Sequence, residues 1–143
     1  EHLHVTARTD ARAAIGLDEA LDRARRALDV GVDAVFVEAP ESIAELEAIA
    51  RALPDCMRVA NMVETGRTPL LTPDELHDLG FDLIVSPLTS LLTVARAVAD
   101  SLALLADEGS LRAHLDRLAT FDEFNEVVDL GGHLEREARY RDG

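Results

Sequence analysis

The segment GLDEALDRARRALDVGVDAVFVEAP, residues 16–40, predicts a helix followed at once by a buried strand. Its first half places apolar side chains three and four positions apart, the spacing of an amphipathic helix over 17–30. Gly31 stands where helices commonly end. The apolar run DAVFVEA, 33–39, is typical of a strand buried in a parallel sheet, and Pro40 ends it. The apolar stripe of the helix consists of Leu17, Ala20, Leu21, Ala24, Ala27 and Leu28.

The same alternation of strand and helix continues on both sides of this segment. Short β-prone runs occupy 3–7, 57–62 and 81–85. A long amphipathic pattern over about 88–107 predicts a helix after the last strand. Four successive strand–helix pairs predict an α/β fold with a parallel sheet.

Capping boxes mark the starts of two further helices. In a capping box, the side chain of a Ser or Thr bonds the backbone N–H of a Glu three residues later, and the Glu side chain bonds back. Pro73 at the first helical position strengthens the second box, and Gly80 ends that helix. The boxes pair Ser42 with Glu45 and Thr72 with Glu75.

The C-terminal part of the chain has a different character. Ser110 and Thr120 are expected to cap two short helices, the second with a capping box between Thr120 and Glu123. The pair Gly131 and Gly132 is expected to break the chain before a last polar helix, roughly 133–141. We therefore divide the chain into an α/β portion, 1–109, and a helical C-terminal appendix, 110–143, which is available for subunit contacts.

Composition limits the classes of protein that fit this chain. The 143 residues, 48% of them apolar, are enough for one domain with a hydrophobic core. We expect a cytoplasmic protein, because no apolar run approaches the about 20 residues of a membrane span and the N-terminus lacks the basic segment of a signal peptide. The single cysteine, Cys56, permits no internal disulfide and fits a reducing compartment.

Charge excludes two classes of partner. The net charge is −14, and all 14 basic side chains are arginine. Such a surface repels polyanions, so neither nucleic acid nor a membrane is expected as a partner. The absence of lysine fits either adaptation to high salt or a GC-rich genome, and neither alternative bears on function.

Polar side chains gather at the carboxyl ends of all four predicted strands. In parallel α/β folds this edge carries the functional groups, because the loops that join strands to helices meet there. The stretch ANMVETGRTPLL, 60–71, is expected to be a strand tip and a loop that folds over a ligand, with Gly66 as its flexible point. The candidate site residues at these ends are Arg8, Glu38, Asn61, Glu64, Thr68 and Thr89.

These residue types suit the recognition of a small anion. The planar guanidinium of Arg8 can bind a carboxylate or phosphonate through two hydrogen bonds. The asparagine and the threonines can donate neutral hydrogen bonds to further oxygens. The two glutamates can orient Arg8, accept a proton from a substrate hydroxyl or hold the water shell of a metal ion.

The remaining polar residues have simpler interpretations. Asp10 is either a helix cap or a turn residue, and Arg67 either contacts a ligand or is solvated. His2 and His4 share one strand face, which also admits a metal pair, although packed or partly exposed imidazoles are expected. Solvated or structural roles are expected for His77, His114, His133 and Cys56.

Four segments follow one another in an order and spacing that resemble those of one known family. They are ARTDARA (7–13), GLDEALDRARRALDVGVDAVFVEAP (16–40), ANMVETGRTPLLTPDEL (60–76) and LGFDLIVSPLTSLL (79–92). The family is the isocitrate lyase/phosphoenolpyruvate mutase family, and the likeness covers about residues 5–100. Within the family, the sequences of these segments are most similar to those of the branch that contains carboxyphosphoenolpyruvate mutase, oxaloacetate decarboxylase and the methylisocitrate and dimethylmalate lyases.

The resemblance implies a (β/α)8 barrel of the TIM type that binds Mg²⁺ and a small 2-oxo or 2-hydroxy acid. The implied activity is that of a lyase, decarboxylase or phosphonomutase working through an enolate-like pyruvate species, which the metal and an arginine stabilise. By motif, Arg8 resembles the arginine that binds substrate and oxyanion, and Glu38 resembles a glutamate near the site.

The resemblance also implies the residues that bind substrate. Asn61, Glu64 and Thr68 resemble groups that contact the substrate carboxylate or phosphonate. Pro87 and Thr89 match a family segment that reads YPLS and here reads SPLT. Ser86 therefore replaces an aromatic residue, so the shape of the pocket, and with it the substrate, is not given by the resemblance.

By the same resemblance the chain begins at strand five of the barrel and covers strands five to eight. The metal-binding aspartates and the cysteine-containing catalytic loop of the family belong to the first four strands, so the Mg²⁺ ligands are expected outside this chain. Four strands cannot close a barrel of eight. We expect a C-terminal part of a longer protein, while completion by a second copy or another chain is the alternative.

Two functional hypotheses follow. In the first, the chain supplies the substrate-anion-binding half of an enzyme active site. In the second, it is a catalytically inactive half-barrel that acts only by oligomeric assembly. The resemblance implies a homo-oligomer, a dimer or tetramer, because family members exchange C-terminal helices between subunits.

Overall fold

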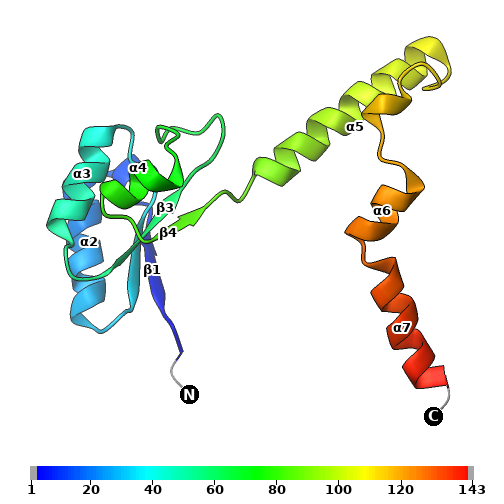
Figure 1. Ribbon diagram of the computed structural model, residues 1–143. Coiled ribbons are helices and arrows are strands. Elements are labelled where there is room, and N and C mark those ends of the chain that lie inside the picture. Colours follow the sequence, from blue (N-terminus) through cyan, green and yellow to red (C-terminus); the bar gives the residue numbers. More distant parts are fainter. Residues whose placement is uncertain (1–2, 142–143) are drawn as a thin grey trace. The chain divides into compact units, whose positions relative to one another are not determined.

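The computed structural model describes residues 3–141 and contains a four-stranded, parallel sheet (Figure 1). The strands stand in chain order, and their registers pair Arg8 with Phe36 and Asn61 with Val85. The predicted α/β order with a parallel sheet is confirmed for this part of the chain, while His2 lies outside the described residues. The strands are β1 (Thr6–Thr9), β2 (Ala34–Val37), β3 (Met57–Asn61) and β4 (Leu83–Val85).

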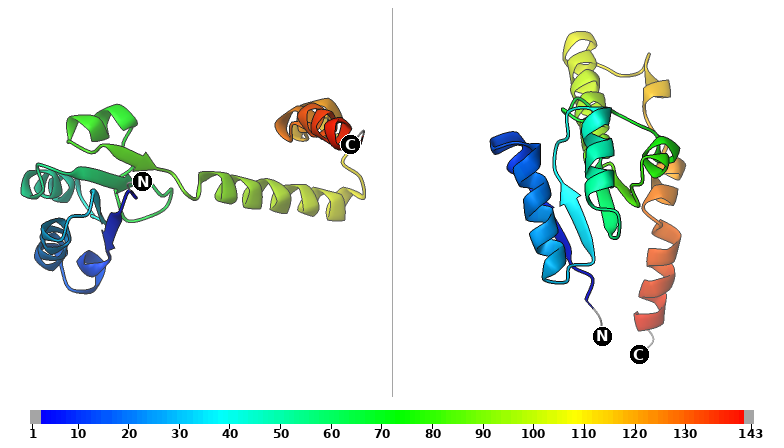
Figure 2. Two further views of the ribbon diagram at one scale, coloured as in Figure 1. Left: turned by 90° about the horizontal axis from the view of Figure 1, so that it is seen from below. Right: turned by 90° about the vertical axis from the view of Figure 1, so that its left-hand side faces the viewer.

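The first four helices lie on one side of the sheet (Figures 1 and 2). Their apolar faces form a single core with the strands, in which Leu46, Ile49 and Leu76 are almost fully buried. The opposite face of the sheet carries Met57 and Leu83, whose side chains are partly exposed within this chain. The helices are α1 (Ala11–Ala14), α2 (Leu17–Asp29), α3 (Ile43–Ala52) and α4 (Pro73–Asp78).

The first strand lies further along the chain than the predicted range 3–7, and the helix that follows it was not predicted. Residues 6–9 pair with β2, whereas Val5 donates its N–H to the side chain of Asp33, with 2.7 Å between the heavy atoms. The hydroxyl of Thr9 then accepts the N–H of Ala11 at 3.3 Å and helps to turn the chain into α1. Thr9 therefore belongs to the strand instead of following it.

The capping box predicted at Thr72 is confirmed, but the one predicted at Ser42 is only half formed. The hydroxyl of Ser42 accepts the N–H of Glu45, as expected. The carboxylate of Glu45 does not bond back to Ser42. It accepts two hydrogen bonds from Arg12, at 2.9 and 2.6 Å, and one from the backbone of Glu41. A charged partner outcompetes the neutral backbone amide of the box because charge-assisted hydrogen bonds are stronger.

This ion pair makes a pH-dependent contribution to stability. The hydrogen bonds from Arg12 are the main reason why the pKa of Glu45 lies below its ordinary value of 4.5. A depressed carboxyl pKa in the folded state stabilises the protein above the ordinary value, and this contribution is lost as the pH falls through the folded-state pKa. Glu45→Gln should therefore lower the urea midpoint at pH 7, and the gap to the wild type should narrow below about pH 4.5.

The matched control for this prediction is Glu47→Gln on the same helix. Glu47 makes a single exposed ion pair with Arg51 at 3.3 Å, for which a smaller effect is expected. A gap between wild type and Glu45→Gln that stays constant from pH 7 to about pH 3 would contradict the prediction.

The long helix predicted over about 88–107 is confirmed, whereas the C-terminal segment differs from expectation at two points. Ser110 does not start a helix, because its hydroxyl instead accepts the N–H of Arg112 in a turn. The two glycines do not break the chain, because α7 begins before them. The break lies at Asp129, which adopts a left-handed backbone (φ 50°) and whose carboxylate accepts the N–H of Gly132. The elements are α5 (Thr89–Glu108), the 3-10 helix η1 (Leu115–Arg117), α6 (Phe121–Val127), whose capping box at Thr120 is complete, and α7 (Leu130–Arg141).

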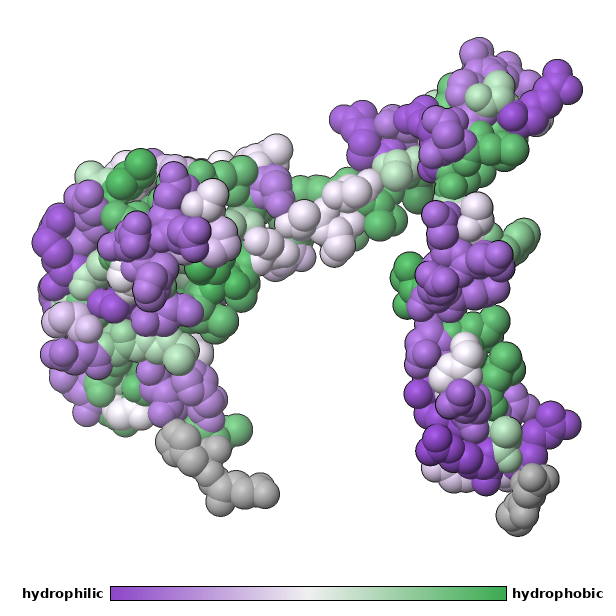
Figure 3. Space-filling model, in the orientation of Figure 1, coloured by the Kyte–Doolittle hydropathy of each residue, from purple (hydrophilic) through white to green (hydrophobic). Residues whose placement is uncertain are grey.

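The chain forms two compact units, one up to Val94 and one from Ala95 onward. The boundary between these two units falls within α5. The predicted boundary at 109/110 is of another kind, because it separates the barrel portion from the C-terminal appendix, and it remains a prediction. Hydrophobic side chains are visible at the surface along the C-terminal segment and α5 (Figure 3). Exposed examples in these helices are Leu91, Val98, Leu102, Phe121, Phe124 and Val127.

The expectation that no segment reaches the length of a membrane span was wrong for α5. Its 20 residues are long and apolar enough to cross a bilayer by length and composition. A single helix of this kind is weak evidence for a membrane span, and Arg96 and Asp100 place an ion pair of 3.8 Å in the middle of it. We therefore draw no membrane function from it.

Candidate anion-binding site

Arg8 is the cationic centre of the carboxyl edge of the sheet. Its Nε and Nη2 donate to the carboxylate of Asp10 at 3.0 and 2.8 Å. Nη2 also lies 3.4 Å from Glu38, and the guanidinium stacks over the ring of Phe36 at 5.0 Å. Because Arg8 and Phe36 are paired across β1 and β2, the register of the sheet itself brings the cation to the ring.

The electrostatics of this cluster keep both charges ionised. The hydrogen bond to Asp10, followed by the charge of Glu38, raises the pKa of Arg8, and Arg8 in turn lowers the pKa of Asp10. Half of the Arg8 side chain is exposed, and its Nη1 makes no hydrogen bond within residues 3–141. The guanidinium can therefore bind an external anion from Nη1, or exchange Asp10 for one.

Asn61 joins the third strand to this cluster. Its amide nitrogen lies 3.4 Å from both oxygens of Glu38, so these hydrogen bonds are long. Its amide oxygen, Oδ1, is buried and has no partner in the described chain. Arg8, Glu38 and Asn61 thus meet at the ends of three adjacent strands, as the sequence predicted.

Glu64 and Thr89 form a second group. The hydroxyl of Thr89, the first residue of α5, donates a hydrogen bond to Oε1 of Glu64, and this bond is the main reason why the Glu64 pKa is lowered. The other oxygen of Glu64, Oε2, is buried and has no partner among the described residues. The structure therefore leaves two buried acceptors, on Asn61 and Glu64, at this edge. A ligand that donates a hydrogen bond would satisfy them.

Two predicted site residues join neither group. Thr68 is half buried in the loop between β3 and α4, residues 62–72, and its hydroxyl bonds to no residue from 3 to 141. Pro87 is exposed in the turn between β4 and α5. Both remain predictions.

Sequence reasoning missed the roles of two neighbours of Arg8. The sequence predicts a cap or turn role for Asp10, yet its carboxylate is the bidentate partner of Arg8 and makes no capping bond. The sequence predicts Phe36 only as part of a buried strand, whereas in the structure its ring lies beneath the guanidinium of Arg8. The two-residue spacing of Arg8 and Asp10 could have predicted this contact, because side chains two residues apart in an extended chain lie on the same face.

Gly66 has a steric role in the loop, and its predicted role as a flexible point remains a prediction. Its φ does not lie in the left-handed region, whereas that of the preceding Thr65 does, at 67°. A Cβ on Gly66 would lie 2.9 Å from the carbonyl oxygen of Val63. The loop therefore needs glycine here because the backbone turns back closely on itself.

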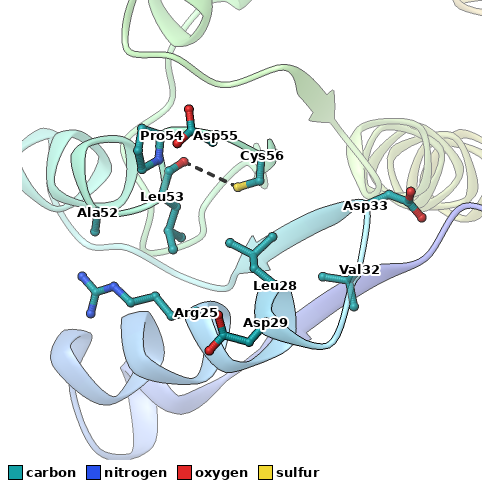
Figure 4. A pocket seen from close by; sticks show the side chains of 10 residues that line it. All are labelled: Arg25, Leu28, Asp29, Val32, Asp33, Ala52, Leu53, Pro54, Asp55 and Cys56. Atoms are coloured by element: carbon teal, nitrogen blue, oxygen red, sulfur yellow. Dashed lines mark hydrogen bonds between the residues drawn. The ribbon is translucent and has the colours of Figure 1, made fainter.

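A hollow of about 500 Å³ lies at the opposite, amino end of the strands (Figure 4). Leu28 and Val32 contribute apolar walls, and Cys56 lines it from the segment before β3. The thiol of Cys56 donates to the carbonyl of Leu53 at 3.5 Å, and burial raises its pKa. A raised thiol pKa disfavours the nucleophilic thiolate, so the structure gives Cys56 a packing role.

Within residues 3–141, no three His, Cys, Asp or Glu side chains come together in a way that could hold a metal ion. A magnesium site requires several oxygen ligands around one point. The described residues therefore do not fit a complete Mg²⁺ site, and we assign this chain no step that passes through the metal.

These features define an α/β protein whose parallel strands present an arginine-centred, anion-recognising edge. The profile of the phosphoenolpyruvate phosphomutase family matches residues 1–106. The chain therefore belongs to this family, within the phosphoenolpyruvate mutase/isocitrate lyase superfamily, and the resemblance seen in the sequence is confirmed.

Individual relatives agree with this assignment. The chain is 49% identical over 139 residues to the chloroplastic carboxyvinyl-carboxyphosphonate phosphorylmutase of Arabidopsis thaliana, covering 95% of this chain and 41% of the relative. It is 37% identical to the 2,3-dimethylmalate lyase of Eubacterium barkeri, covering 97% and 48%. A solved oxaloacetate acetylhydrolase in complex with the inhibitor 3,3-difluorooxalacetate superposes with a TM-score of 0.85 at 30% identity, covering 94% and 45%.

The chain thus spans less than half the length of these relatives. The TIM-barrel type of the superfamily agrees with the parallel α/β unit described above. The assignment of the four strands to positions five to eight of a barrel remains a proposal.

Proposed function

We propose that this chain is the substrate-anion-binding half of a Mg²⁺-dependent carbon–carbon lyase, decarboxylase or phosphonomutase. The substrate is a small 2-oxo or 2-hydroxy acid, and the reaction passes through an enolate-like pyruvate species. The observation that carries the proposal is the meeting of Arg8, Glu38 and Asn61 at the ends of three adjacent parallel strands. Relatives that act on small carboxylates and phosphonates support the substrate class.

Each residue has a role that follows from its contacts. Arg8 binds the substrate anion and stabilises negative charge as it develops on the enolate oxygen. Glu38 contacts both Arg8 and Asn61, so it holds the two donors in one orientation. The unpaired oxygens of Asn61 and Glu64 accept hydrogen bonds from a hydroxyl of the substrate or an ordered water.

The remaining elements of the site complete this proposal. Thr68, Pro87 and Thr89 shape the pocket, and the Mg²⁺ ligands come from the half of the barrel outside this chain. The protein is a cytoplasmic homo-oligomer, a dimer or tetramer, with neither nucleic acid nor a membrane as partner.

The proposal is tested by assaying the full-length protein with Mg²⁺ against oxaloacetate, 2-methylisocitrate and 2,3-dimethylmalate. Turnover of at least one acid is expected, and it should disappear when the metal is chelated. The 143-residue chain assayed alone should be inactive, because its described residues offer no metal site. Failure of the full-length protein to turn over any member of the panel would count against this function.

The runner-up is a catalytically inactive half-barrel that acts only by assembly. The partly exposed face of the sheet and the exposed apolar side chains of α5 favour it. The intact mass of the native polypeptide separates the two hypotheses. A mass near 15.5 kDa would favour assembly, and about twice that mass would favour the enzyme.

A further inference from the structure

Four charged residues outside the Arg8 cluster form a continuous series of ion pairs across the carboxyl edge. Arg67 contacts Glu41 at 3.1 Å, and the same Oε1 of Glu41 lies 2.8 Å from Arg12. Arg12 in turn contacts Glu45 at 2.6 Å. We call this series the rim ion-pair chain, with the members Arg67, Glu41, Arg12 and Glu45.

The rim ion-pair chain links the three loops that carry the candidate site. Arg12 belongs to α1, directly after Arg8 and Asp10. Glu41 lies between β2 and α3, three residues after Glu38, and Arg67 lies between β3 and α4, next to Thr68. Ion pairs therefore connect the first of these strand-to-helix connections to the second, through Arg12 and Glu41, and the second to the third, through Glu41 and Arg67.

The two ends of the series differ in how firmly they are held. The side chains of Arg12 and Glu45 are 18% and 22% exposed and are joined by two parallel hydrogen bonds. The side chains of Arg67 and Glu41 are 66% and 38% exposed and are joined by one. Bidentate, partly buried pairs resist salt and solvent, whereas single exposed pairs are weak and screened.

The loop at 62–72 is connected to the rim ion-pair chain through its weaker end, the Arg67–Glu41 pair. Its base is tied to the sheet by the N–H of Met62, which donates to Val85 at 2.8 Å, and its middle by the Glu64–Thr89 bond. In the described chain, the only polar contact from Arg67 to another loop is the one to Glu41. We propose that Arg67 and Glu41 are positioning residues that form a salt-sensitive latch, which holds the 62–72 loop against the rigid Arg12–Glu45 pair.

The latch is tested by amide hydrogen exchange in the whole chain. The reporter is the N–H of Gly66, which donates to Val63 at 3.0 Å within the loop, next to Arg67. An exposed ion pair contributes little, so Arg67→Gln and Glu41→Gln should each speed exchange at Gly66 by about two- to fivefold. The N–H of Met62, bonded to β4, should not change and serves as the internal reference.

Three further measurements separate a latch from a general loss of structure. The double variant Arg67→Gln/Glu41→Gln should exchange no faster than Glu41→Gln alone, because that single variant already breaks the Arg67–Glu41 pair together with the contact from Glu41 to Arg12. Arg67→Lys should restore slow exchange, since it keeps the charge. Raising NaCl from about 0.01 M to about 1 M should speed exchange at Gly66 in the wild type and leave Arg67→Gln unaffected.

The matched control is Arg51→Gln. Arg51 is as exposed as Arg67, at 69%, and makes a single ion pair of 3.3 Å on α3, away from the loop. It should leave exchange at Gly66 unchanged. Unaltered Gly66 exchange in both Arg67→Gln and Glu41→Gln, or additive effects in the double variant, would overturn the latch. Neither result depends on enzymatic turnover, so the proposed function is tested separately.

Discussion

Replacing Arg8 with alanine should lower kcat/KM of the full-length protein by about 100- to 1000-fold, the usual cost of removing one donor to a developing oxyanion. Arg8 is the only cation among the described residues that contacts Glu38, and it carries an unused Nη1. Without it, Asp10, Glu38 and Glu64 leave this edge of the sheet negative and repel an anionic substrate. The measurement is steady-state turnover of whichever acid the panel identifies.

Two companion variants sharpen this test. Arg8→Lys keeps the charge but cannot form the bidentate contact, so it should recover only part of the lost activity. Arg26→Ala is the control, because Arg26 is an exposed residue of α2 that pairs with Asp22 at 3.2 Å and has no part in the site. Near-normal turnover by Arg8→Ala, with circular dichroism unchanged, would remove Arg8 from the active site.

Leu46→Ala should lower the free energy of unfolding of the first unit by about 2–5 kcal/mol. This is the usual range when a buried leucine is truncated to alanine and leaves a cavity in the core. Leu46 is 1% exposed and lies on α3, which packs on α2 and the sheet. The measurement is urea unfolding followed by far-ultraviolet circular dichroism. Fluorescence is unsuitable, because the chain has no tryptophan and its one tyrosine, Tyr140, lies in the second unit.

The control for Leu46 is the same substitution at an exposed position. Leu91 is 61% exposed in α5, and Leu91→Ala should change the free energy of unfolding by less than about 0.5 kcal/mol. Equal effects of the two substitutions would show that α3 does not anchor the core described here.

Much of the fold could be predicted from local patterns. The stripe over 17–30 became α2, with Ala20, Leu21 and Ala24 buried, because helical spacing alone decides which side chains share a face. The boxes at Thr72 and Thr120 formed as predicted, since all their partners lie within four residues. At Ser42 the same pattern was only half right, because Arg12, 33 residues away in sequence, took the carboxylate of Glu45.

The sequence by itself determined which residue types stand at the carboxyl ends of the strands, because a parallel sheet places all those ends on one edge. Only the tertiary structure decided which of them touch. Arg8 meets Phe36 through strand register, Asn61 meets Glu38 across 23 residues, and Thr89 meets Glu64 across 25. The physical reason is that a side chain bonds the partner that folding brings within about 3 Å, and that distance depends on the packing of whole elements.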